Sequence, residues 1–201
     1  MKAAILLNGE PYCGGMIEGD YVICCDGAYE WAKYKVHIDE LLGDFDSLSA
    51  FPEGVAVNRF PVEKNATDGE LALEHALDMG ASFIAIYGGG GLREDHFLGN
   101  LHLLYKAHKY GAEAVMFTER AQLSISEHLR TLSCAKGKTV SIIPFGGDAH
   151  ILHSSGFQYP MEDLWLRYGS TRGISNVIAS EEGAVFYSEG TVLVVVNERI
   201  V

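Results

Sequence analysis

The chain predicts an α/β domain with a mostly parallel sheet, followed by an all-β domain. Through roughly the first 120 residues, short apolar runs alternate with helical patterns, as in βαβ units whose strands are buried on both faces. Beyond the segment 119–128, strand-like runs follow one another and no strongly periodic helix interrupts them. The 201 residues, 48% of them hydrophobic, suffice for one or two domains with a real core.

Five apolar runs are predicted to be buried strands of the first domain. They cover residues 3–7, 21–25, 55–60, 83–87 and 114–117. A helix is predicted over residues 68–79, because Thr67 and Glu70 have the spacing of a capping box and Gly80 provides the stop. Its apolar side chains Leu73, Ala76 and Leu77 recur at helical spacing.

A second helix is predicted over residues 95–110. Leu98, Leu101 and Tyr105 share one of its faces, and basic residues gather at its C-terminal end, where they suit the helix dipole. In the all-β domain, strands are predicted over residues 123–126, 139–143, 184–187 and 191–196. The segment Ser188-Glu189-Gly190 is expected to join the last two strands as a hairpin turn, with the glycine at positive φ.

Charge and composition restrict the possible partners. The 15 basic and 27 acidic residues give a net charge of −12, which disfavours nucleic acid and anionic membranes as main partners. No apolar stretch reaches the length of a membrane span, and the apolar start ends too soon, at Asn8-Gly9, for a secretory signal. We therefore expect a cytoplasmic protein. Its four cysteines include no C-x-x-C pair, so neither a disulfide nor a zinc site is expected.

The most informative motif is Gly43-Asp44-Phe45-Asp46-Ser47, which places two carboxylates one residue apart. In an extended chain Asp44 and Asp46 point the same way, while Phe45 turns back into the protein. At about 4 Å and an effective dielectric near 20, two such charges repel by roughly 4 kcal/mol, so they share a proton or bind a cation. Oxygen ligands favour Mg²⁺, which completes its shell with water and substrate phosphates. A solvated acidic turn is the alternative for this motif taken alone.

Three polar clusters are expected at the carboxyl ends of the predicted strands, where open α/β sheets bind ligands. They are Asp26-Gly27-Ala28, Thr67-Asp68 and the segment from Gly88 to His96. The four consecutive glycines of the last cluster suit a close backbone approach or an anion nest, and a flexible solvent loop is an equal alternative for them alone. Arg93 favours the first interpretation, because a guanidinium is the usual partner of phosphate oxygens.

Two acidic residues of these clusters also have structural explanations. Asp68 complements the dipole of its helix, and Asp95 is a possible N-cap. As a third carboxylate beside Asp44 and Asp46, however, Asp68 would complete a metal site. Together with Arg93 and the glycines, these acids are typical of phosphoryl or pyrophosphoryl transfer from a metal-bound nucleotide.

In their order and spacing, these motifs resemble thiamine pyrophosphokinase of the bacterial type. The resemblance extends to Leu98-Gly99-Asn100 and to the segment from Gly169 to Asn176, and so covers nearly the whole chain. It implies a Rossmann-like catalytic domain over residues 1–122 that binds ATP and Mg²⁺, and a β-sandwich domain over residues 123–201 for thiamine binding and dimerisation. The implied reaction transfers pyrophosphate from ATP to the hydroxyethyl group of thiamine, giving thiamine diphosphate and AMP.

The resemblance also implies roles for individual residues. The expected Mg²⁺ ligands are Asp44, Asp46 and Asp68, which with Arg93 and Asp95 form the catalytic group. The expected ATP contacts are Asp26, Gly27, Ser47, Gly88, Gly89, Gly90, Gly91, Arg93, His96 and Asn100. The expected thiamine contacts are Thr67, Asp95, Ser170, Arg172, Ser175 and Asn176, with those of the second domain supplied by the partner subunit of a homodimer. Asn65 after Lys64 and Leu92 before Arg93 depart from the usual pattern, which has aspartate and glycine there.

The thiamine hydroxyl is expected to attack the β-phosphorus in line, so that positioning and charge neutralisation dominate catalysis. Either Asp95 or Asp68 is the candidate to accept the proton. Two rival interpretations are weaker. A haloacid dehalogenase phosphohydrolase would use Asp44 as nucleophile, but expects threonine at the position of Leu48. A non-enzymatic module that senses nucleotides or binds carbohydrate through its C-terminal domain would leave the acids as surface charge.

Overall fold

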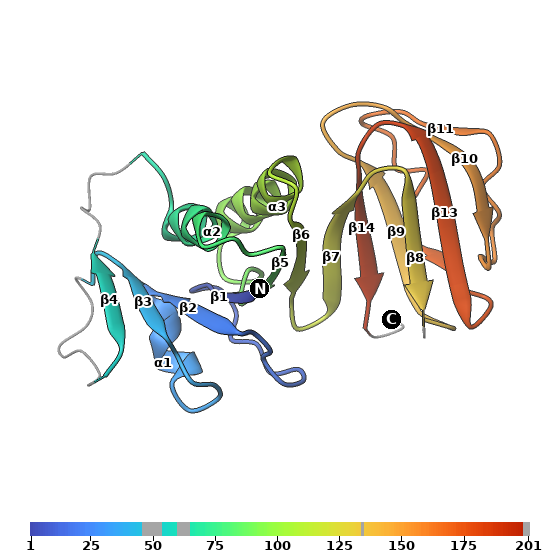
Figure 1. Cartoon of the computed structure of the whole chain (residues 1–201). Helices are drawn as coiled ribbons and strands as arrows, with labels where there is room; N and C mark the ends of the chain where they lie inside the picture. Colours follow the sequence, from blue (N-terminus) through green and yellow to red (C-terminus); the bar gives the residue numbers. More distant parts are fainter. Residues whose placement is uncertain (46–53, 60–64, 134, 199–201) are drawn as a thin grey trace. The chain divides into compact units, whose positions relative to one another are not determined.

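The computed structural model describes residues 1–45, 54–59, 65–133 and 135–198 (Figure 1). The chain consists of two compact units, Met1–Glu119 and Arg120–Val201. The first is an α/β unit and the second is all β, so the predicted fold class is confirmed. The division expected after residue 122 would cut strand β7 (Ala121–Ser126), whereas the units separate just before that strand.

In the described part of the first unit, the sheet contains six parallel strands in the order β6-β5-β1-β2-β3-β4. Their bounds are β1 Lys2–Leu6, β2 Tyr21–Cys25, β3 Glu40–Gly43, β4 Ala56–Arg59, β5 Phe83–Tyr87 and β6 Glu113–Phe117. The central strand β1 is buried on both faces, because residues 3–6 have no exposed surface. The small side chains of Ala3 and Ala4 point to opposite faces of the sheet and allow helices to approach both faces closely.

Helices cover both faces of this sheet. A 3₁₀ turn, η1 (Asp26–Ala28), leads into the short helix α1 (Tyr29–Ala32) on one face, while α2 (Asp68–Asp78) and α3 (Glu94–Lys109) lie over the other (Figure 1). The predicted start of α2 is confirmed, since the hydroxyl of Thr67 accepts a hydrogen bond from the backbone N–H of Glu70 at 3.2 Å. Its predicted stop is confirmed by Gly80, which has a φ of 82°.

The structure corrects two predictions of burial. The run 55–60 was expected to be buried on both faces, yet Ala56, Val57 and Arg59 are exposed, because β4 pairs only with β3 and lies at the edge of the described sheet. Leu98 was expected to share a buried face with Leu101, but it is 60% exposed. No residue from 94 to 100 is buried, so the first two turns of α3 extend beyond the core.

The second unit consists of two antiparallel sheets that enclose one core. One sheet has the order β12-β9-β14-β7 and the other β11-β10-β13-β8. The strands not yet given are β8 Leu129–Ser133, β9 Thr139–Pro144, β10 Ala149–Ser155, β11 Leu164–Leu166, β12 Asn176–Val177, β13 Glu182–Glu189 and β14 Val192–Asn197. Buried side chains from both sheets, among them Ile142, Ile151 and Val194, form a single apolar cluster, which is the core of a β-sandwich.

Three of the four cysteines lie in the described part of the chain. Cys24 and Cys25 are buried and Cys13 is exposed, while Cys134 lies outside it. Burial raises the pKa of the Cys24 thiol to about 12, so this cysteine is an inert core residue. Within the described residues, no helix is both long and apolar enough to span a membrane.

Candidate active site

One cleft of the first unit lies where the strand order of its sheet reverses. Strands β2, β3 and β4 extend to one side of β1, and β5 and β6 extend to the other. Open α/β sheets bind ligands at such a point, beyond the carboxyl ends of the strands. A cleft of about 360 Å³ is found there. It is lined by Leu7, Asn8, Gly9, Cys25, Asp26, Gly27, Thr67, Asp68, Gly69, Gly89, Gly90, Gly91, Leu92, Arg93, His96 and Asn100.

The glycine loop continues the pairing of β1 with β5. Leu7 N–H donates to the carbonyl of Tyr87 at 2.8 Å, Gly9 N–H to that of Gly88 at 2.9 Å, and Glu10 N–H to that of Gly90 at 2.7 Å. A side chain on Gly9 would run into the carbonyl oxygens of the loop. Residues 88–90 are buried and exposure begins at position 91. The first three glycines are therefore not a flexible solvent loop, and that alternative is wrong for them. They are buried where two backbone segments approach each other closely.

Three side chains that the sequence did not single out, or assigned otherwise, hold this loop region. The amide of Asn100 on α3 donates to the carbonyl of Gly89 at 2.9 Å, so that residue reaches the loop as well as the cleft. The indole of Trp31 donates to the carbonyl of Leu7 at 3.2 Å. Asn8 lies against Gly27, where a Cβ would meet its amide. Like the predicted clusters, Asn8-Gly9 follows a strand. This position in the sequence is the signal that could have identified Asn8 as a residue of the site.

The acidic rim of the cleft combines residues from separate strand ends. Asp26 follows β2 and Asp68 begins α2, and both line the cleft. Asp44 follows β3, and the neighbouring Gly43 is so close to Asp26 that a Cβ on it would lie 2.9 Å from the Cβ of Asp26. Asp46 and Ser47 lie outside the described residues.

Convergence of Asp44 and Asp46 by strand alternation requires an extended chain, and Phe45 does not meet this requirement. Phe45 has a φ of 57°, in the left-handed region, although its ring is buried in the core as expected. Strand alternation therefore does not carry through this residue. Among the described residues, no three His, Cys, Asp or Glu side chains are grouped closely enough to hold a metal ion.

Arg93, which lines the cleft, forms a two-pronged ion pair with Asp95. The Nε and Nη2 atoms of Arg93 donate to Oδ1 and Oδ2 of Asp95 at 3.0 and 2.6 Å. Helix α3 begins at Glu94 with Arg93 in the cap position, so the alternative role of Asp95 as N-cap is wrong. The carboxylate does accept the backbone N–H of His96 at 2.9 Å. The hydrogen bonds from Arg93 lower the pKa of Asp95 to about 2.

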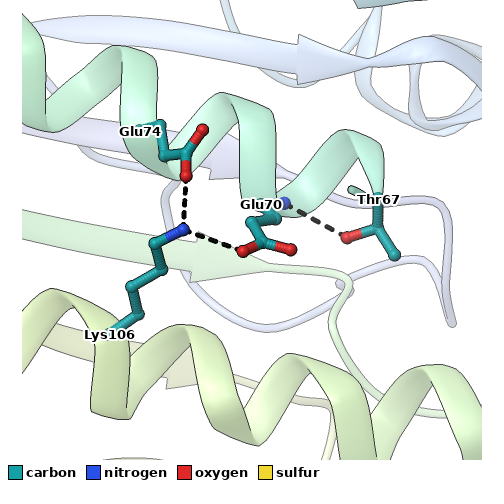
Figure 2. A network of polar contacts seen from close by, with 4 residues as sticks. All are labelled: Thr67, Glu70, Glu74 and Lys106. Carbon is teal, nitrogen blue, oxygen red and sulfur yellow. Dashed lines mark hydrogen bonds and ion pairs between the residues drawn. The ribbon is translucent and has the colours of Figure 1, made fainter. Parts of the chain in front are cut away.

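A second groove, of about 500 Å³, adjoins the cleft between α2 and α3. Thr67, His96 and Asn100 line both. The other lining residues of this groove are Glu70, Asp95, Gly99, His102, Leu103, Tyr105 and Lys106. Lys106 reaches from α3 to the carboxylates of Glu70 and Glu74 on α2 (Figure 2). The carboxylates of Glu70 and Asp95, both ion-paired, therefore line the groove together with the ring of Tyr105.

The predicted thiamine residues of the second unit lie at the end of the connection from β11 to β12. Ser170, Arg172 and Ser175 are exposed. Ser175 has a φ of 63° and its N–H donates to the hydroxyl of Ser141 at 3.1 Å. Asn176 is buried, and its amide exchanges hydrogen bonds with the backbone of Tyr159. The structure therefore gives Asn176 a role in holding this unit together, and leaves the other three side chains at the surface.

Two family models match the chain over its two units. "Thiamin pyrophosphokinase, catalytic domain" matches residues 16–116, and "Thiamin pyrophosphokinase, vitamin B1 binding domain" matches residues 123–193. The thiamine pyrophosphokinase of Bacillus subtilis (strain 168) is 31% identical over 164 residues, which cover 78% of this chain and 77% of that protein. This chain belongs to the thiamine pyrophosphokinase family. The resemblance predicted from the motifs is confirmed, and both rival interpretations are excluded.

Solved structures of thiamine pyrophosphokinases share the fold. The crystal structure of the Bacillus subtilis protein has a TM-score of 0.88 and 25% identity, with all of both chains covered. That from Geobacillus thermodenitrificans has a TM-score of 0.83 and 26% identity, covering 99% of this chain and 98% of the other. The chain is therefore a thiamine pyrophosphokinase enzyme, of a family that uses ATP, and its second unit contains a thiamine-binding domain.

Proposed function

We propose that the enzyme binds ATP in the 360 Å³ cleft and transfers its terminal pyrophosphoryl group to the hydroxyethyl group of thiamine, releasing AMP. The observation that supports this site most directly is its lining. The cleft brings together the carboxylates of Asp26 and Asp68, the side chain of Arg93 and the backbone of the glycine loop. Such a site offers donors to a polyphosphate chain and oxygen ligands to a cation.

The donor set on the acidic rim fits Mg²⁺. Asp44 and Asp68, with Asp46 of the same motif, would hold the ion by oxygen ligands, and Mg²⁺ needs only one or two carboxylates when phosphates complete its shell. Bound there, the ion would neutralise charge on the phosphate oxygens. Asp26 lies beside Gly43 and adds negative charge to this rim.

The ion pair of Arg93 argues against Asp95 as the proton acceptor. A carboxylate with a pKa of about 2 is a weak base, and both of its oxygens already accept hydrogen bonds from the guanidinium. We assign Asp95 the task of orienting Arg93, whose remaining N–H groups then point to the phosphates. Asp68, at the start of α2, is the carboxylate that both lines the cleft and adjoins the second groove through Thr67.

The second groove is the candidate place for thiamine on this chain. Thr67 and Asp95, which the family resemblance assigns to thiamine, both line it. By resemblance to the family, Ser170, Arg172, Ser175 and Asn176 of a partner subunit complete the thiamine pocket of a homodimer.

Product analysis tests the reaction. The purified enzyme is incubated with ATP and Mg²⁺, with and without thiamine, and nucleotides and thiamine phosphates are separated by chromatography. Attack on the β-phosphorus gives AMP and thiamine diphosphate in equal amounts, and only when thiamine is present. Formation of ADP and thiamine monophosphate would show attack on the γ-phosphorus, and AMP without thiamine would show hydrolysis. Asp44→Asn serves as the low-activity control.

A further inference from the structure

A single lysine ties the first turns of α2 to α3. The hydroxyl of Thr67 caps α2 by accepting from Glu70 N–H, and the carboxylate of the same Glu70 accepts from Lys106 Nζ at 2.8 Å (Figure 2). Lys106 also pairs with Glu74, one turn further along α2. Because Thr67 and Asp68 both line the cleft, this contact acts on the turn that presents Asp68.

The charges of this network favour a fixed arrangement. Glu70 and Glu74 are four residues apart on one helix, where like charges repel. Lys106 lies between them with its side chain 24% exposed, and hydrogen bonds from Glu70 and Glu74 raise its pKa to about 12. The ammonium therefore stays charged at physiological pH. Lys106 is separated from Glu70 by 36 positions in the sequence and from Glu74 by 32, so these contacts join two helices and are not local pairs within one helix.

We propose that Lys106 is a positioning residue for pyrophosphate transfer, holding the first turn of α2 through Glu70 so that Asp68 stays at the rim of the ATP cleft. This inference rests on the proposed function. Lys106 lines the second groove and not the cleft itself, so it acts through another residue. Displacing a catalytic group by about 1 Å is enough to cost as much as 10²-fold in rate, which makes a clamp of this kind consequential.

Steady-state kinetics and hydrogen exchange of Lys106→Met test the clamp. The variant removes the charge and keeps the apolar stem. We expect kcat to fall about tenfold with a smaller change in the KM for thiamine, because a misplaced Asp68 affects the reaction more than thiamine binding. Backbone amides of residues 68–74 should exchange faster, and Lys106→Arg should recover most of kcat. Lys33→Met, which breaks the i,i+3 pair with Glu30 elsewhere in the first unit, is the matched control and should change neither quantity.

Two outcomes overturn the proposal. One is a Lys106→Met enzyme with wild-type kcat, even if its melting temperature falls; the other is a loss of kcat that Lys33→Met reproduces. Should Lys106→Met fail to fold, Glu70→Gln and Glu74→Gln replace it. Glu70→Gln should lower kcat and Glu74→Gln should not, and equal effects contradict the clamp. A wild-type enzyme that makes no thiamine diphosphate would refute the proposed function instead, while exchange at residues 68–74 would still report on the contact.

Discussion

Arg93 donates to both oxygens of Asp95. Substituting one residue of this pair at a time tests the role of each residue separately. Arg93→Lys keeps the charge but loses the planar fork that engages both oxygens of Asp95 and that we propose also engages a phosphate. We expect the KM for ATP to rise about tenfold, with the KM for thiamine nearly unchanged, measured by initial rates over both substrates. Equal increases for both substrates would indicate a general structural role.

Asp95→Asn separates an orienting role from a role as general base. Since its lowered pKa is about 2, Asp95 is ionised throughout the assay range and loses its charge only as the pH falls through that value. We expect the pH dependence of kcat to be the same in the variant and the wild type, and the KM for ATP to rise as in Arg93→Lys. A changed pH dependence, with a loss in kcat of roughly 10²-fold or more, would identify Asp95 as the base.

A buried carboxylate at the start of β3, that of Glu40, leads to a prediction about stability. Glu40 has 7% of its side chain exposed, accepts from the hydroxyl of Tyr21 at 3.0 Å, and lies 2.9 Å from Nε2 of His75. His75→Ala removes one partner and should lower the free energy of unfolding by about 1–3 kcal/mol, measured by urea denaturation. His37→Ala is the control, because that ring is 83% exposed near Asp39 and should cost less than about 0.5 kcal/mol. Similar costs for both would contradict the assigned importance of the buried contact.

The backbone ladder between the loop after β1 and the glycine loop is the element on which the cleft depends. Gly9→Ala forces a Cβ into the carbonyl oxygens of Gly88 and Gly90, and the loops must separate. Overpacking of this kind costs about 1–3 kcal/mol in stability, and we expect ATP binding measured by calorimetry to weaken as well. Gly15→Ala, where a Cβ meets no atom within 4 Å, is the control. Unchanged ATP affinity in Gly9→Ala would show that the ladder does not shape the site.

The sequence revealed the long elements and missed the short ones for physical reasons. Helix α2 has an N-cap, a periodic apolar face and a terminal glycine, so local signals agree with its tertiary packing. Strand β3 has four residues and begins with Glu40, whose burial depends on Tyr21 and His75 from other elements. No local pattern contains that information. Leu98 was misplaced because helical spacing defines a face but not where the core beneath that face ends.

At the scale of the molecule, the order of strands explains why the candidate site residues converge. Chain order predicted that Asp26, Thr67-Asp68 and the glycine loop follow strands, and the reversal at β1 brings all three to one cleft. The sequence alone did not show which partner each side chain contacts. The pairing of Arg93 with Asp95 and the engagement of Asn176 by Tyr159 depend on rotamers and neighbours in three dimensions.

The last prediction concerns the proposed homodimer with shared sites. The structure guides the choice of variants for this test. Asn176→Ala would remove hydrogen bonds that hold the second unit, so the exposed loop residues are better targets. One chain carries Asp44→Asn, and the other carries Arg172→Ala with Ser175→Gly, since glycine tolerates the φ of 63° at that position. Both homodimers should be nearly inactive. The two chains are co-expressed with different affinity tags so that the heterodimer is purified by both.

If each site combines the first unit of one chain with the loop of its partner, the heterodimer contains one doubly altered site and one intact site. Its turnover should then return to about half that of the wild type, because the two sites of a symmetric dimer are equivalent. Sites built within single chains would each keep an alteration, and the heterodimer would be as inactive as its parents. A verified heterodimer without recovered turnover would therefore refute the shared site, while membership of the thiamine pyrophosphokinase family would stand unchanged.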